Sequence, residues 1–420
     1  MFIHGFQGLL GIVLFLGFCW LISENRKNVS LKVIISGLLT QVFLAVIMTE
    51  LPMVRSFFMK LGHLVTALKD ATLQGTSFVF GYIGGGEIPF LTKDGGNTFS
   101  LTFQALPMVF VVSAISMLLF YWRILPLIVR CFAWVLQRIM GIGGALGVCG
   151  AAKIFLGQTE APLLIRPYLN ELSRSELFTV MTLGMATTSG TVMALYAALL
   201  DSAVPNVLSH ILTASIISVP AAITLSRIMI PQIGEVTSGN LIMPYEFTSS
   251  MDAISKGASD GIRLFINIVA VLIVFVALVA LLNKLMASLL PYVYGEPLTL
   301  QRILGTIMAP FTWLMGIPWE EAKIAGSLLG TKTILNEIYA FTELSRTSQE
   351  LLSPHSRLIM VYALCGFANF SSIGIQIGGL GTMAPERRKD IISLGFKAVF
   401  AGTLSTMMSG TIVGLLSHFH

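Results

Sequence analysis

The chain has 420 residues, of which 55% are hydrophobic and only 11% are charged. Because soluble domains carry about a quarter of their residues as charged side chains, this composition excludes an ordinary soluble protein and predicts one helical membrane domain. The net charge of +5 comes from basic residues scattered between apolar segments, so a nucleic-acid-binding surface is not indicated.

Eight apolar segments have the length and hydropathy expected of membrane-crossing helices. The predicted spans are 6–22, 33–48, 105–121, 177–200, 204–229, 263–289, 357–382 and 391–417. Basic residues mark alternate connections, for example Arg26 and Lys27 after the first span and Arg387 and Arg388 after the seventh. By the positive-inside rule those connections are cytoplasmic and both termini lie outside.

Two further apolar regions, about 142–172 and 304–345, are interrupted by polar residues, glycine or proline. A single crossing by either would place the downstream basic loops on the wrong side, so each is predicted to be a re-entrant hairpin. Segments 52–70 and 126–140 mix apolar and charged residues at helical spacing and are expected to lie along the membrane interface. The connection 232–262 is predicted to be a polar cytoplasmic loop.

The two interrupted regions share a pattern. "KIFLGQTEAP" begins at Lys153 and "KTILNE" at Lys332, and each leads from a lysine through apolar residues to a polar cluster with a glutamate. At similar distances downstream come "GMATTSG" from Gly184 and "GFANFSS" from Gly366. Either motif alone is equally consistent with helix packing, but their matched order favours a repeat of hairpin, broken span and final span. The basic residues give the two units opposite orientations, and such an inverted repeat is typical of secondary transporters.

Carboxylates at membrane depth are candidate functional residues, because an ionised one costs roughly 2.5 to 3.5 kcal/mol there on insertion scales. Glu160 and Glu337 end the two lysine motifs and meet this criterion. Groups that both donate and accept hydrogen bonds lie in the first lysine motif and in the two downstream motifs: Gln158, Thr159, Thr187, Asn369, Ser371 and Ser372. They suit a neutral polyhydroxylated or heteroaromatic ligand better than a simple anion, and Phe367 and Phe370 add flat apolar surface.

Other chemistries have no support in the sequence. No Walker A or HExxH motif is present, and the four cysteines lack a paired-ligand spacing, so no ATP-driven pump, enzyme, metal site or cofactor is expected. Lys153 leaves two interpretations open. Its long side chain either extends towards the cytoplasmic interface or occupies the position of a coupling cation.

At these motifs the chain resembles the concentrative nucleoside transporter family. The resemblance covers most of the chain, from "FVFG" at Phe78 through "GQTEAPLLIRPY" to "CGFANFSSIGIQIGGLG" at Cys365. It implies an all-α, elevator-type transporter of nucleosides that forms a homotrimer in the bilayer of a bacterial inner membrane. The expected organisation is a scaffold of spans 1–3 and interfacial helices (1–141), a first repeat (142–229), a cytoplasmic loop with scaffold span 6 (230–303), and a second repeat (304–420).

The resemblance also implies the roles of individual residues. Gln158, Thr159 and Glu160 on the first hairpin would face the nucleobase, with Val192 packed beside it. The residues implied to hold the ribose hydroxyls, and to line the pocket there, are Glu337, Asn369, Ser372 and Phe367.

Lys153 departs from the family pattern. Sodium-coupled members carry an asparagine there, which ligates sodium together with a hydroxyl residue matching Thr187. A fixed ammonium would repel sodium, so the sequence predicts proton:nucleoside symport, with titration of Lys153, Glu160 or Glu337 supplying the coupling. Sodium:nucleoside symport on the same fold is the alternative, and an embedded enzyme or structural protein is a third interpretation. Purine or pyrimidine preference is left open.

Overall fold

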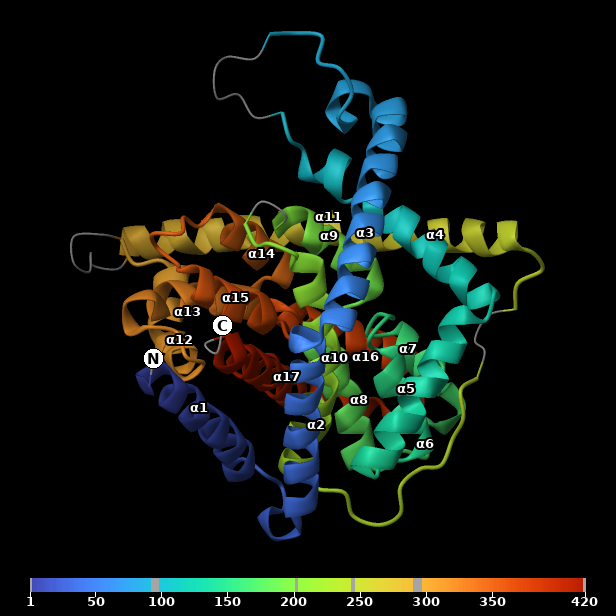
Figure 1. The fold of residues 1–420 in the computed structure, drawn as a ribbon, viewed down its shortest axis with the longest axis vertical. Helices are drawn as coiled ribbons and strands as arrows, with labels where there is room; N and C mark the ends of the chain where they lie inside the picture. The colour runs from blue at the N-terminus through green and yellow to red at the C-terminus, as the bar shows by residue number, and fades with distance from the viewer. Residues whose placement is uncertain (1, 92–97, 201–202, 243–245, 290–296, 418–420) are drawn as a thin grey trace.

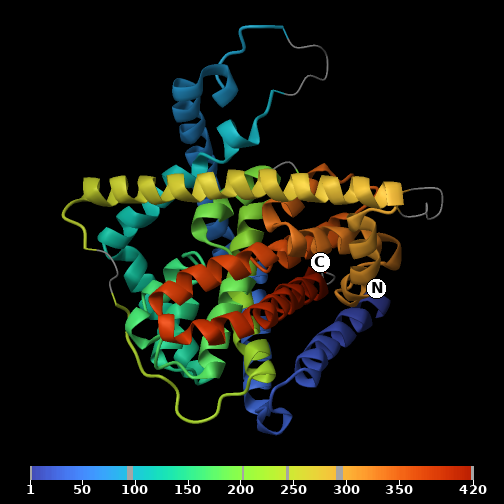
Figure 2. The same cartoon turned by 180° about the vertical axis from the view of Figure 1, so that it is seen from behind.

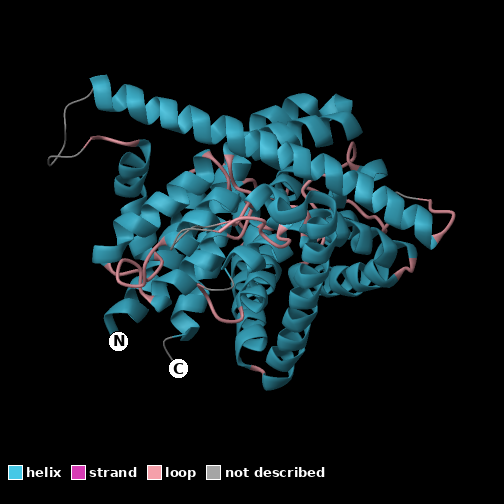
Figure 3. Ribbon diagram, turned by 90° about the horizontal axis from the view of Figure 1, so that it is seen from above, coloured by secondary structure: helices cyan, strands magenta, loops and turns pink. Residues whose placement is uncertain are grey.

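The computed structural model describes residues 2–91, 98–200, 203–242, 246–289 and 297–417, so the last three residues of the predicted second repeat lie outside it. Helices joined by loops make up this described part, which holds no strand (Figure 3). Six of its helical stretches have the length and hydropathy of a membrane span, and Gly5–Leu21 is a shorter apolar helix. The prediction of an all-α polytopic membrane protein is confirmed, whereas the count of eight crossings stays a prediction.

The N-terminal part begins with three helices: α1 (Phe2–Leu21), α2 (Leu31–Glu50) and α3 (Pro52–Phe80). Pro52 occupies the first turn of α3, where its missing N–H costs no helical hydrogen bond. α3 is ten residues longer than the predicted helix at 52–70, and it projects beyond the rest of the helical body (Figures 1 and 2). A π-helical turn at Leu101–Ala105 then leads into α4 (Met108–Tyr121).

The helix α11 (Ser250–Leu289) runs across the width of the molecule in Figure 2. It starts within the segment predicted to be a polar loop at 232–262. The cause is close packing: a Cβ on Gly257 would lie 2.6 Å from Ala114 Cα, and one on Gly261 would lie 2.8 Å from Phe110 Cα. Glycines one turn apart let α11 approach α4, so this polar segment is helical because of its tertiary contacts.

The remaining helices repeat one order of elements twice. The first set is α5 (Ile124–Met140), α6 (Gly144–Ala152), α7 (Glu160–Leu163), α8 (Arg174–Ala186), α9 (Gly190–Leu200) and α10 (Val207–Met229). The second is α12 (Leu300–Leu314), α13 (Trp319–Ile334), α14 (Glu337–Arg346), α15 (Pro354–Leu364), α16 (Phe370–Met383) and α17 (Arg388–Ser417). Each set runs from an amphipathic helix through two hairpin arms and a broken helix to a long helix. The predicted spans 177–200 and 357–382 are therefore each two helices, interrupted at the motifs singled out above.

The two long helices α10 and α17 form the centre of the core and are buried along most of their length. Their many hydroxyl groups donate to carbonyls of their own helix, as Thr224 does to Pro220 O at 2.7 Å. Others join helices: Ser218 and Ser409 hydroxyls lie 2.9 Å apart, and Gln41 Nε2 of α2 donates to Ser409 Oγ at 3.1 Å. These hydroxyl and amide groups are thus paired inside the protein without water, although others, such as Ser215 Oγ of α10, have no partner among the described residues.

Candidate functional site

A cavity of about 300 Å³ lies where the two hairpin tips meet the two broken helices. All eight residues predicted to bind substrate line it: Gln158, Thr159, Glu160, Val192, Glu337, Phe367, Asn369 and Ser372. They come from segments more than two hundred residues apart in the chain. The volume is at the lower end of the range for small-molecule pockets.

The first hairpin brings a polar turn into this cavity. α6 ends at Ala152 and α7 begins at Glu160, so residues 153–159 form a non-helical tip. Gly157 N donates to Glu160 Oε2 at 3.0 Å, which folds the tip back and fixes the carboxylate. Gln158 Nε2 lies 3.4 Å from Ser372 Oγ, whereas Gln158 Oε1 has no partner among the described residues. Gln158 thus lines the cavity and carries a buried acceptor that is unpaired among the described residues.

The second hairpin places Glu337 opposite. Asn336 caps the start of α14, because its Oδ1 accepts from Tyr339 N at 2.9 Å. Glu337 is the first residue of the helix, where the positive end of the helix dipole favours a carboxylate. Its side chain is nearly buried, and each oxygen already accepts one hydrogen bond: Oε1 from Tyr196 OH at 2.7 Å and Oε2 from Asn369 Nδ2 at 3.1 Å.

The break before α16 fixes Asn369. Its Oδ1 accepts from Ser372 N at 2.8 Å and from Ser371 Oγ at 2.7 Å, so it is the N-cap of α16. With the amide oxygen committed to the cap, the amide nitrogen is left to donate to Glu337. The same cap leaves Ser372 at the cavity wall. One asparagine thus links the broken helix to the second hairpin.

Lys153 and Thr187, the residues of the predicted coupling site, do not line this cavity, whereas Glu160 and Glu337 do. Lys153 is 0% exposed, and its Nζ has no hydrogen-bond partner in the described part of the chain. The ammonium sits 5.9 Å from the centre of the Phe367 ring and interacts electrostatically with Glu160. Thr187 ends α8, and its hydroxyl donates to Leu183 O at 2.8 Å. The structure therefore contains no hydrogen bond between Lys153 and Thr187.

Several residues around the site were not predicted. Asn267 of α11 lines the cavity, and an amide within a mainly apolar span was a signal that could have identified it. Lys332 is completely buried, with Nζ 2.9 Å from Ala363 O and 3.3 Å from Thr406 Oγ1. Tyr196 does not belong to a recognisable motif. Its contact with Glu337 joins residues that are 141 positions apart in the chain, so sequence spacing does not reveal it.

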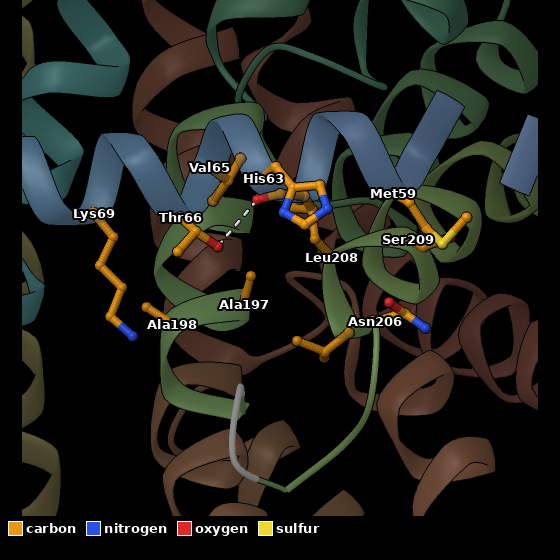
Figure 4. Close-up of a pocket in the computed structure, with 12 residues that line it drawn as sticks. Met59, His63, Val65, Thr66, Lys69, Ala197, Ala198, Asn206, Leu208 and Ser209 are labelled. Atoms are coloured by element: carbon orange, nitrogen blue, oxygen red, sulfur yellow. Dashed lines mark hydrogen bonds between the residues drawn. The ribbon is translucent and has the colours of Figure 1, made fainter. Parts of the chain in front are cut away.

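A second cavity, of about 210 Å³, lies between α3 and the segment around the start of α10 (Figure 4). His63 and Lys69 of α3 and Asn206 line it, and it contains none of the predicted site residues. Among the described residues no group of three His, Cys, Asp or Glu side chains is arranged to hold a metal ion. The cavity between the hairpins is therefore the candidate site.

Family profiles match the chain in three blocks. They are "Na+ dependent nucleoside transporter N-terminus" over residues 10–83, "Nucleoside recognition" over 102–203, and "Na+ dependent nucleoside transporter C-terminus" over 210–414. Together they span most of the chain, and the C-terminal block contains the second hairpin and the break at Asn369.

Full-length relatives agree with the profiles. The nucleoside permease NupC of Helicobacter pylori is 35% identical over 410 residues, which cover 96% of this chain and 95% of that protein. The uncharacterised transporter YutK of Bacillus subtilis is 36% identical, with 97% and 98% covered. The mouse sodium/nucleoside cotransporter 1 is 33% identical over 97% of this chain, which spans 63% of the longer mouse protein.

Solved structures share the fold. CNTnw in an inward-facing substrate-bound state superimposes with a TM-score of 0.89 at 33% identity, over 99% of this chain and 98% of that one. An outward-facing state of a CNTnw variant gives a TM-score of 0.90, also at 33% identity, over 100% and 99%. The named relatives are permeases and transporters, so the protein is a nucleoside transporter and not an enzyme. The chain belongs to the concentrative nucleoside transporter family.

Proposed function

We propose that this protein carries out proton:nucleoside symport in the inner membrane of a bacterium. The observation that carries the proposal is Lys153, a fully buried lysine whose Nζ has no hydrogen-bond partner within the described part of the chain. It sits at the tip of the first hairpin, against the ring of Phe367. The profile description and the mouse relative name sodium, so sodium:nucleoside symport is the alternative.

An ammonium disfavours a second cation nearby. Two unit charges 4 Å apart repel by about 4 kcal/mol at an effective dielectric constant of 20, which would weaken sodium binding by roughly a thousandfold. Among the described residues no acceptor is hydrogen-bonded to the ammonium of Lys153, so a proton is the coupling ion that this position suits best. The electrostatic interaction with Glu160 would pass a change of charge to the hairpin tip that lines the cavity.

For the substrate, the first hairpin would hold the nucleobase and the second the ribose. Gln158 Oε1, which is unpaired among the described residues, would accept from an N–H of the base. The ring of Phe367 and the side chain of Val192 offer apolar surface in the same cavity. Glu337 has lone pairs beyond those used by Tyr196 and Asn369, and a carboxylate can accept from two neighbouring hydroxyls. Recognition of ribose hydroxyls would thus rest mainly on Glu337, Asn369 and Ser372.

An elevator-type homotrimer is part of the proposal. α11 is almost entirely exposed along its most apolar stretch and packs mainly against α4. An isolated chain would leave that surface to lipid, whereas neighbouring copies would cover part of it. Mass photometry of the detergent-purified protein tests this: three chains per particle supports the trimer, and a single chain contradicts it.

The experiment for coupling uses proteoliposomes and radiolabelled uridine and adenosine. We expect uptake under a pH gradient without sodium, and one proton per nucleoside allows up to about tenfold accumulation per pH unit. Lys153→Asn should abolish this pH-driven accumulation and introduce a response to sodium. Lys323→Asn, which changes an exposed lysine of α13, is the matched control and should transport normally.

Uptake by the wild-type protein driven only by sodium would refute the coupling proposal. A Lys153→Asn variant with unchanged pH dependence and no sodium response would do the same. Absence of uptake of either nucleoside under any gradient would refute nucleoside symport itself.

A further inference from the structure

Tyr196 lies behind the candidate site without lining the cavity. It is 0% exposed, and its ring packs on Phe341 of the second hairpin with ring centres 4.8 Å apart. Its hydroxyl donates to Glu337 Oε1 at 2.7 Å. Tyr196 can therefore act on the site only through the cavity-lining carboxylate to which its hydroxyl donates.

Glu337 is held by two hydrogen bonds from different parts of the chain. Tyr196 of α9 binds one oxygen, and Asn369 at the break before α16 binds the other. Lys332 lies in the same hairpin, but its ammonium is hydrogen-bonded to Ala363 O and Thr406 Oγ1. The position of the carboxylate therefore depends on a contact between the first repeat and the second.

We propose that Tyr196 is a positioning residue for substrate recognition. By binding Oε1 it sets the rotation of the Glu337 carboxylate, so that the remaining lone pairs face adjacent hydroxyls of a ribose. The inference rests on the proposed nucleoside site. Loss of the Tyr196 hydroxyl would let the carboxylate rotate, and nucleosides with ribose hydroxyls would lose more affinity than those without them.

The hydroxyl and the ring of Tyr196 have separable roles. Phenylalanine would keep the packing on Phe341 and remove only the hydrogen bond to Glu337. The chain also offers a matched control in Tyr362, a second completely buried tyrosine. Its hydroxyl is hydrogen-bonded to His210 Nδ1 at 3.1 Å, away from the cavity. Comparing Tyr196→Phe with Tyr362→Phe separates the effect that acts through Glu337 from the general cost of removing the hydroxyl of a buried tyrosine.

The test measures uptake of uridine and of 2′,3′-dideoxyuridine into proteoliposomes. For Tyr196→Phe we expect the KM for uridine to rise about tenfold, the size typical of one hydrogen bond to a charged group. The KM for the dideoxy compound should change less than about twofold, so the preference for ribose falls. Tyr362→Phe should leave that preference unchanged.

Three results would overturn the inference: an unchanged uridine KM in Tyr196→Phe, an equal rise for both substrates, or the same loss of preference in Tyr362→Phe. Failure of the wild-type protein to take up uridine would instead refute the proposed function. Uridine binding to Tyr196→Phe, Glu337→Gln and the double variant provides a second measurement that does not depend on transport. The changes in the free energy of uridine binding should be non-additive in the double variant, because Tyr196 acts through Glu337. Additive changes would count against this role of Tyr196.

Discussion

Replacing Asn369 by aspartate would test the geometry of the site most directly. Asn369 caps α16 through Oδ1 and donates to Glu337 through Nδ2, 3.1 Å from Oε2. Aspartate keeps the capping oxygen, since Asp and Asn are equally good N-caps. It replaces the donor by a second carboxylate oxygen at the same place. The substitution therefore preserves the local fold and reverses one interaction.

The size of the effect follows from that distance. Two unit charges 3.1 Å apart repel by about 5 kcal/mol at an effective dielectric constant of 20. Placing a proton on an ordinary carboxylate at pH 7 costs about 4 kcal/mol, which is less than this repulsion. When the aspartate introduced at position 369 and Glu337 are in contact, the two carboxylates would therefore share a proton. In the free protein the two side chains can move apart, and the cost appears when a nucleoside closes the site. Affinity should fall by up to about 1,000-fold at pH 7.

The assay is equilibrium binding of uridine to purified protein between pH 5.5 and pH 7.5. The ratio of Kd values between Asn369→Asp and wild type should fall about tenfold for each unit of acidification, because each unit lowers the cost of the proton by 1.36 kcal/mol. Asn369→Ala removes the donor without adding a charge, so its ratio should not depend on pH. A ratio for Asn369→Asp that is constant over this range would refute the reasoning.

Two further predictions concern the framework of the site. Hydrogen bonding to Arg174, assisted by Lys397, lowers the pKa of Glu24 to about 2, so its stabilisation is present above about pH 4.5 and lost as pH falls towards 2. Because the Glu24 side chain is 30% exposed, Glu24→Gln should lower the free energy of unfolding by only about 1 kcal/mol. The Tm of the variant should therefore lie below that of the wild type at pH 7, and the difference should shrink by pH 3. An equal Tm difference at the two pH values would contradict this. Gly366→Ala should destabilise the fold by about 1–3 kcal/mol and slow uptake, because a Cβ there would meet Met185 O at 2.9 Å. Gly374→Ala, which has open space, is the thermal-unfolding control, and equal Tm values for both would argue against a close contact of the broken helices.

Much of the site could be predicted because its residues fall in two short motifs per repeat. Polar groups in apolar sequence are costly, so their presence in "GQTE", "NE" and "FANFSS" already indicated hairpin tips and a helix break. The structure brings all eight predicted substrate residues around one cavity. Their contacts with a nucleoside remain a prediction.

Residues that support the site could not be found in this way. Tyr196 contacts Glu337 because of how the second hairpin packs against α9, and Lys332 of the same hairpin contacts Ala363 and Thr406 of α15 and α17. A tyrosine or lysine in an apolar helix has many structural uses, and spacing alone does not identify its partner. Asn267 was recognisable as an amide in a mainly apolar span, but its place in the cavity wall depends on how α11 packs beside the cavity.

The sequence by itself determined that the chain is a helical membrane protein, where its helices break, and which polar residues stand at those breaks. Local pattern suffices there, because hydropathy and helix-breaking residues act over a few turns. The tertiary structure alone decided that α11 starts at Ser250, that Glu337 is held by a tyrosine of the other repeat, and that Lys153 is buried without an acceptor among the residues that the structure describes. Those features depend on close packing between segments far apart in the chain, which no local pattern encodes.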